Sequence, residues 1–393
     1  MKLRYMHRWV SLLLSVALIP LLWHLHLPLR FDWIKLGIAY WFVLAAQSIF
    51  VATLLYVIGI AKRDARKAFV DRWRQEPMRI VLLFFFFSIL AWAFGGIKAV
   101  VLTVDTIALL ECRERRNLGT LDELVFAILL PALYFFLGFL LVLAYNCVVV
   151  STRFNFAYDP MFNAMDRWIL GGASVSDLSH WAVRTFSLPW LRFLEFIYFG
   201  MFPQIGAGIL IVGLYDQKSR SLQFVGTLLM AYYLALGLFY LWPSQGPYYL
   251  CPVHFSQFPS SLQAYAIQKL LISDAMALWN HVPIPRLSTD YFIAFPCMHI
   301  AQPLIVMWFL RRWNRILLAL CAYDTILIVA ILFLEWHYLV DILGGVVVAG
   351  VAIAITESTS WRKQKTGSCG TQVPEKALSA GWKCEKPQEL SRG

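Results

Sequence analysis

Long apolar stretches alternate with short polar segments along almost the whole chain. A helix needs about 20 mainly apolar residues to cross the hydrocarbon core of a bilayer, and nine stretches reach or approach that length. Their cores are residues 9–27, 36–60, 80–102, 124–150, 190–214, 224–241, 295–310, 316–334 and 336–356. The pattern therefore predicts an all-α protein built as a polytopic bundle of transmembrane helices.

The composition agrees with this fold class. Hydrophobic residues make up 60% of the 393 positions, with 16 Trp and 29 Phe, and the mean hydropathy is +0.64, which is far outside the range of soluble domains. The formal net charge is +11, but the basic residues lie in short segments beside apolar stretches, which is the positive-inside pattern of membrane proteins. We therefore expect no nucleic-acid partner.

The seven Cys residues have neither CxxC nor Cys/His ligand spacing. Several of them lie inside apolar stretches, where a thiol behaves as a small hydrophobic group. The sequence therefore predicts neither a disulfide framework nor a metal site.

Three regions follow from the changes in composition. Residues 1–120 hold the first spans, whose role the sequence does not indicate, and residues 121–357 hold the remaining spans. Residues 358–393 are polar and rich in Lys, Gly, Ser and Pro, so we expect a disordered tail. Within the middle region, residues 158–187 mix Trp with Arg and are interpreted as an amphipathic surface segment.

Basic clusters at residues 62–79, 113–116 and 311–315 favour the cytoplasmic side of a membrane. Nine simple spans cannot place all three clusters there, so we expect that residues 80–110 do not cross simply. The third cluster places the loop of residues 241–295 outside. This orientation and the short loops lead to the hypothesis of a bacterial inner-membrane protein with its site on the non-cytoplasmic face.

Two histidines and one aspartate are the strongest candidates for chemistry. His337 and Asp341 are four residues apart at the start of an apolar stretch, which on a helix brings their Cβ atoms to about 5–6 Å. The carboxylate would fix the tautomer of His337 and leave its other nitrogen as a nucleophile. His299 begins another apolar stretch on the same side and could protonate a departing oxygen.

A structural interpretation competes with each of these assignments. A single histidine near a membrane interface is more often structural than catalytic, and we interpret the other candidates in this way. They are His24, His26, His180 and His281. The pair of His337 and Asp341 could likewise be a hydrogen bond between helices, and so could Asp324, Glu195 and Asp166.

The motifs around these residues resemble the type 2 phosphatidic acid phosphatase superfamily, and most closely its inositol phosphorylceramide synthase branch. Residues 295–299 read Phe-Pro-Cys-Met-His where the branch has Phe-Pro-Ser-x-His, and residues 337–345 match its His-Tyr-x-x-Asp-x-x-Gly-Gly stretch. The likeness covers about residues 124–356. It implies a six-helix core in which His337 forms a phosphohistidine, Asp341 orients it, and His299 acts as general acid and then base. It implies no metal and no other cofactor.

Two departures narrow this expectation. Cys297 stands where the family has Ser, and a thiol is a weaker hydrogen-bond donor than a hydroxyl. The basic motif of the hydrolytic phosphatases is also missing, and Ile331 stands where they carry an Arg before the second histidine. Because a dianionic phosphate needs strong cationic partners, these changes favour a monoanionic phosphodiester substrate.

The outer loop supplies the remaining candidates for substrate binding. Arg286 is the first choice for a phosphate contact, and Lys269, Gln245 and Tyr248 lie in the same loop. Cys297 and the backbone N–H groups after it could also face an anion, because they begin a helix. Glu335, two residues before His337, is interpreted either as a solvated residue or as one that modulates the site.

The leading hypothesis is an enzyme that cleaves a lipid phosphate ester or phosphodiester and passes the phosphoryl or phospho-head group to an alcohol or to water. One alternative is a plain lipid-phosphate phosphatase of the same superfamily. Another is a transporter or membrane scaffold, in which His337 and Asp341 form a proton relay or a structural pair. The sequence does not indicate the donor lipid, the acceptor or the oligomeric state.

Overall fold

The computed structural model describes residues 13 and 128 and the segments 130–153, 158–215, 218–250, 262–280, 282 and 292–367. The first predicted spans, apart from Leu13, lie outside the described residues, and so do Arg286 and most of the predicted tail. The described part is helical and contains no strand. The prediction of an all-α membrane bundle is therefore confirmed.

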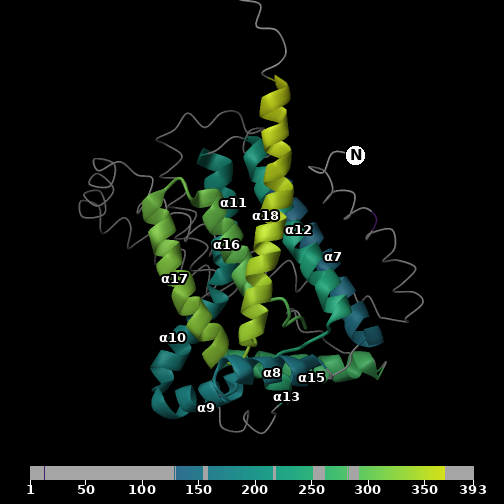
Figure 1. Cartoon of the computed structure of the whole chain (residues 1–393), viewed down its shortest axis with the longest axis vertical. Coiled ribbons are helices and arrows are strands. Elements are labelled where there is room, and N and C mark those ends of the chain that lie inside the picture. Colours follow the sequence, from purple (N-terminus) through teal and green to yellow (C-terminus); the bar gives the residue numbers. More distant parts are fainter. Residues whose placement is uncertain are drawn as a thin grey trace, which may run out of the picture.

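Six long segments run side by side and form the bundle (Figure 1). They are α7 (Leu130–Arg153), α10 and α11 (Leu188–Phe199 and Met201–Tyr215), α12 (Lys218–Leu241), α16 (Met298–Leu310), α17 (Asn314–Phe333) and α18 (Leu339–Gly367). Five of these segments are long and apolar enough to cross a membrane, with α10 and α11 counted as one, and α16 is a shorter apolar helix. The six correspond to the last six predicted spans, and most ends differ by a few residues. Helix α18 instead continues to Gly367, past the predicted end at residue 356 and into the first part of the predicted tail.

Four shorter helices lie across one end of the bundle (Figure 1). They are α8 (Tyr158–Ile169), α9 (Val175–Thr185), α13 (Pro247–Leu250) and α15 (Gln263–Trp279). In α8 the side chains of Phe162, Asp159 and Asp166 are buried, whereas Trp168 and Met165 are exposed. Helices with one buried face and one exposed apolar face are typical of a membrane interface, as the sequence predicted for this segment.

Carboxylates fasten this end layer to the bundle. Asp166 on α8 accepts hydrogen bonds from the N–H groups of Leu339 and Val340, at 2.7 and 3.1 Å, in the first turn of α18. Glu195 on α10 accepts one from Ala264 at the start of α15. The first N–H groups of a helix have no partner within it, and satisfying them with an anion contributes about 1 kcal/mol each. These acids are therefore caps of distant helices.

The two motif segments differ from the predicted helix starts. The predicted spans begin at Phe295 and Trp336, whereas α16 begins at Met298 and α17 and α18 are separated by residues 334–338. Glu335 has a φ of 62°, which a helix cannot accommodate. His337 therefore lies in a turn before α18.

Helices α16 and α18 meet through a glycine contact. A Cβ atom on Gly345 would lie 2.3 Å from the carbonyl oxygen of Cys297, and one on Gly344 would lie 2.6 Å from the ring of Phe295. The first of these obstacles is backbone, which cannot move aside as a flexible side chain does. The two glycines of the second motif thus allow α18 to approach the residues that precede His299.

Candidate active site

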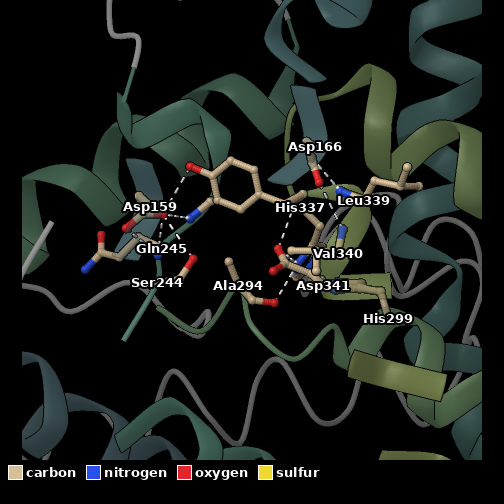
Figure 2. A network of polar contacts seen from close by, with 12 residues as sticks. Asp159, Asp166, Ser244, Gln245, Ala294, His299, His337, Leu339, Val340 and Asp341 are labelled. Carbon is tan, nitrogen blue, oxygen red and sulfur yellow. Dashed lines mark hydrogen bonds and ion pairs between the residues drawn. The ribbon is translucent and has the colours of Figure 1, made fainter. Parts of the chain in front are cut away.

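His337 is anchored through one nitrogen of its ring. Its Nδ1 lies 2.9 Å from the carbonyl oxygen of Ala294 and 3.4 Å from Oδ2 of Asp341 (Figure 2). Both neighbours are acceptors, so Nδ1 carries a proton and donates it. The other nitrogen, Nε2, is thereby left to face the second histidine.

The closeness of His337 and Asp341 has a different origin from the one predicted. They do not share a helix face, because only Asp341 is helical. Asp341 occupies the third position of α18, where its Oδ2 accepts a hydrogen bond of 2.8 Å from the N–H of Tyr338 just before the helix. This is one half of a capping box, and it holds the carboxylate beside the preceding turn that contains His337.

His299 completes the pair from the first turn of α16. Its Nδ1 lies 3.0 Å from Nε2 of His337. The ring is held by stacking on Tyr198, with centroids 4.5 Å apart, and Tyr198 stacks in turn on Trp336 at 4.7 Å. The structure thus brings together the three predicted catalytic residues and adds Ala294 and Tyr198, which no motif in the sequence indicates.

The surroundings of His337 favour its protonated form. Burial opposes the charge, but the neighbouring Cys297 sulfur and the Asp341 carboxylate together outweigh it and raise the pKa of His337 above its ordinary value. One proton is then shared across the short contact between Nε2 of His337 and Nδ1 of His299. Its position decides which of the two rings has a free electron pair.

A pocket opens beside this pair. Its lining consists of Tyr198, Met201, Phe202, Tyr232, Gln245, Tyr248, Ile293, Met298, His299, Gln302, Trp336 and His337. Neither Lys nor Arg is among these lining residues, which all belong to the described part of the chain. The predicted residues Gln245 and Tyr248 therefore lie at the pocket.

Several neutral polar atoms of the pocket have no hydrogen-bond partner among the described residues. They are both amide atoms of Gln245, Oε1 of Gln302, Nε1 of Trp336 and Nε2 of His299. Buried polar atoms are costly in a folded protein unless protein, water or a ligand satisfies them, and a set of them around one pocket is typical of a site for a polar ligand.

Asp159 on α8 organises the loop that carries Gln245. Its Oδ1 accepts hydrogen bonds from the Ser244 hydroxyl and from the N–H groups of Gln245 and Gly246, at 2.9–3.0 Å (Figure 2). Gly246 has a φ of 114°, and a Cβ there would lie 2.6 Å from the carbonyl oxygen of Trp336. Burial raises the pKa of Asp159 to about 7 despite these hydrogen bonds.

Of the other predicted binding residues, neither Cys297 nor Lys269 lines the pocket. Cys297 precedes α16, is fully buried, and donates its N–H to the carbonyl oxygen of Asp341 at 3.0 Å, so this N–H is not available to an anion. Lys269 is exposed on α15 with its ammonium 4.6 Å from the centre of the Tyr265 ring, and it does not line the pocket. Arg286 lies outside the described residues.

Asp324 joins two helices of the bundle. Both of its carboxylate oxygens accept hydrogen bonds of 3.2 Å from Gln204, which lies on α11. The structural interpretation of Asp324 as a contact between helices is therefore confirmed.

Glu335 is a buried carboxylate near the site that has no hydrogen-bond partner at normal distance among the described residues. It is 1% exposed, and neither carboxylate oxygen has a hydrogen bond of normal length among the described residues. Burial raises its pKa to about 7, with Asp177 adding to the rise and the nearby Ser176 hydroxyl only partly opposing it. The residue is therefore not solvated, which excludes one of the two interpretations drawn from the sequence.

We expect Glu335 to make the protein less stable as the pH rises. Its pKa is higher in the folded state, so its contribution is favourable below the ordinary value of 4.5 and is lost as the pH rises through about 7. The loss amounts to up to about 3 kcal/mol. Melting of the purified protein in detergent, from about pH 5 to about pH 8, should show a smaller decrease for Glu335→Gln than for the unaltered protein.

A residual decrease is expected in that variant, because burial also raises the pKa of Asp159 to about 7 and of Asp166 to about 6. Identical pH profiles for the two proteins would show that Glu335 stays ionised and finds a partner.

Comparison with known proteins adds one finding. Residues 164–355 match the sequence model of the PAP2 superfamily, which is the superfamily of the type 2 phosphatidic acid phosphatases. The match begins within α8 and ends within α18, so it contains both histidines and Asp341. Neither the curated proteins nor the solved structures that were searched contain a match to the chain.

Proposed function

We propose, from the premise that residues 164–355 are a PAP2-superfamily domain, that the chain is a membrane phosphotransferase that acts on a lipid phosphodiester through a phosphohistidine at His337. The observation that carries the proposal is the contact of 3.0 Å between Nε2 of His337 and Nδ1 of His299, at a pocket with no cationic side chain in its described lining.

The shared proton provides the first half of the reaction. When it moves from His337 to His299, Nε2 of His337 gains a free electron pair and His299 becomes an acid. Nε2 then attacks phosphorus, the bond from phosphorus to the leaving oxygen breaks, and His299 gives its proton to that oxygen. Ala294 and Asp341 accept the Nδ1–H of the cationic phosphohistidine and stabilise it.

The second half reverses these roles. An acceptor hydroxyl gives its proton to His299, its oxygen attacks phosphorus, and the bond from Nε2 to phosphorus breaks. His337 is thereby restored. The same residue serves as acid and then as base because each step is the chemical reverse of the other.

The substrate must separate the two rings before it reacts. A nucleophile approaches phosphorus to about 3–3.5 Å before attack, and the leaving oxygen lies beyond the phosphorus. The separation of 3.0 Å between the two nitrogens therefore leaves no room for a phosphoryl group between them. The structure corresponds to the resting pair.

The neutral pocket supports a phosphodiester as donor. A dianionic monoester needs strong positive partners, whereas the groups without partners here are amide, indole and imidazole atoms of Gln245, Gln302, Trp336 and His299. Such atoms suit a monoanionic diester and a neutral hydroxylated group. We place the site on the non-cytoplasmic face of a bacterial inner membrane, following the distribution of basic residues.

The experiment that tests this proposal is an assay of the purified protein with a panel of radiolabelled phospholipids, with and without alcohol acceptors. A new phospholipid that requires the acceptor is the expected product. Free phosphate released from a lipid monoester would instead indicate the plain phosphatase. Turnover that is equal in the protein and in its His337→Ala variant would exclude both enzymes and leave the transporter or scaffold.

A further inference from the structure

Cys297 lies beside the histidine pair. Its sulfur and one ring nitrogen each of His299 and His337 all lie within 4.8 Å of one another, and no other group of this kind is found among the described residues. The three side chains come from the turn before α16, from its first turn, and from the turn before α18. The glycine contact between α16 and α18 holds these segments together.

The spacing of the nitrogens is close to that of a tetrahedral metal site. Zinc binds imidazole nitrogen at about 2.0–2.1 Å, so two such ligands at a tetrahedral angle lie roughly 3.3 Å apart. The observed separation is 3.0 Å. The geometry that excludes a phosphoryl group between the rings therefore needs only a small adjustment to accept a metal ion.

The ligand types favour the same ion. A thiolate with two imidazoles is a ligand set for zinc, and sites with three protein ligands keep a fourth position for water or substrate. His337 also has the outer partners that orient a metal-bound imidazole, since its Nδ1 faces the Ala294 carbonyl and Asp341. Both histidines line the pocket, which provides a path for entry.

We propose that Cys297, His299 and His337 form a Zn²⁺ site that inhibits the enzyme reversibly by occupying the electron pair of the nucleophile. The inhibition rests on the function proposed above, whereas the binding of the ion does not. Binding replaces the thiol proton of Cys297 and the proton shared by the two rings, and releases both to solvent. Affinity for Zn²⁺ therefore increases with pH.

The test of binding uses Co²⁺ as a spectroscopic substitute for Zn²⁺ in the purified full-length protein. We expect a thiolate-to-cobalt charge-transfer band together with the absorption of a tetrahedral Co²⁺ ion, and we expect added Zn²⁺ to remove both. Cys297→Ser should lose the thiolate-to-cobalt band, and His337→Ala should lose the absorption of tetrahedral Co²⁺. Cys321→Ser is the matched control, because Cys321 is an exposed thiol on α17, and it should retain the spectrum.

The test of inhibition compares each variant with its own metal-free rate. Zn²⁺ should inhibit the unaltered protein and Cys321→Ser at the same concentration. Half-inhibition of Cys297→Ser should need a Zn²⁺ concentration higher by roughly tenfold or more, because the loss of a metal ligand lowers metal affinity at least as much as the loss of an outer partner. A thiolate band that persists in Cys297→Ser, or its absence from the unaltered protein, would overturn the site. A normal band in a protein without lipid turnover would refute the proposed function and leave the metal site intact.

Discussion

His337→Ala is expected to lose turnover by a factor on the order of 10⁴ or more, as in hydrolases that lack their nucleophile, together with all covalent phosphoenzyme. The reason is that Nε2 of His337 faces His299 beside the pocket, while Nδ1 is held by Ala294. Rapid quench in alkali with a lipid labelled at phosphorus measures both quantities, because phosphohistidine is stable in alkali, and loss of the protein-bound label on acid treatment of a parallel sample identifies it.

His299→Ala is the matched comparison, since it removes the other ring of the same contact. A general acid typically contributes about 10²–10⁴-fold, and it contributes least when the leaving group is already a weak base. We therefore expect His299→Ala to form phosphoenzyme slowly from an aryl phosphodiester and much more slowly from a lipid. Equal losses on both substrates, in both variants, would contradict this division of roles.

Gly345→Ala is expected to produce the second largest effect. The new methyl group would lie 2.3 Å from the Cys297 carbonyl oxygen, so α18 must move away from the start of α16. Overpacking of this kind costs typically 1–3 kcal/mol. Because α16 carries His299 and the turn before α18 carries His337, the shift also separates the two rings. We therefore expect a loss of lipid turnover even at temperatures where the variant is still folded.

Gly350→Ala provides the control for that experiment. Gly350 lies on the same helix, and a Cβ atom there has nothing within 4 Å. This variant should match the unaltered protein in turnover and should melt at the same temperature or slightly higher, because alanine is the better helix former. A Gly345→Ala protein with full activity would show that the spacing of α16 and α18 does not set the geometry of the pair.

Local spacing and hydropathy were sufficient to predict the described helices of the bundle and the proximity of His299, His337 and Asp341. The last six apolar stretches each correspond to a described helical segment, because the length of a span is fixed by the thickness of the bilayer, although α18 continues past the predicted end to Gly367. The approach of His299 to His337 followed from the position of each near the start of a span on the same side. Asp341 was also paired with His337, although the physical reason given for it was wrong.

The remaining contacts depend on tertiary structure that a single sequence does not contain. The Ala294 carbonyl is a backbone group, and nothing in an alanine marks its oxygen as the partner of a histidine. Asp159 lies in a short polar segment, and its partners Ser244 to Gly246 are more than 80 positions away. Asp166 was interpreted as a contact between spans, whereas it caps α18 from outside the bundle.

The two aspartates of α8 connect this helix, which lies at the end of the bundle, to both segments that carry residues of the candidate site. Asp159 holds the loop that carries Gln245, and Asp166 holds the start of α18 beside His337, so one rigid element aligns both walls of the pocket. The opposite face of α8 exposes Trp168 and Met165. Under the proposed function, lateral pressure and headgroup packing in the surrounding lipid would act on this face, and through Asp159 and Asp166 on both parts of the site.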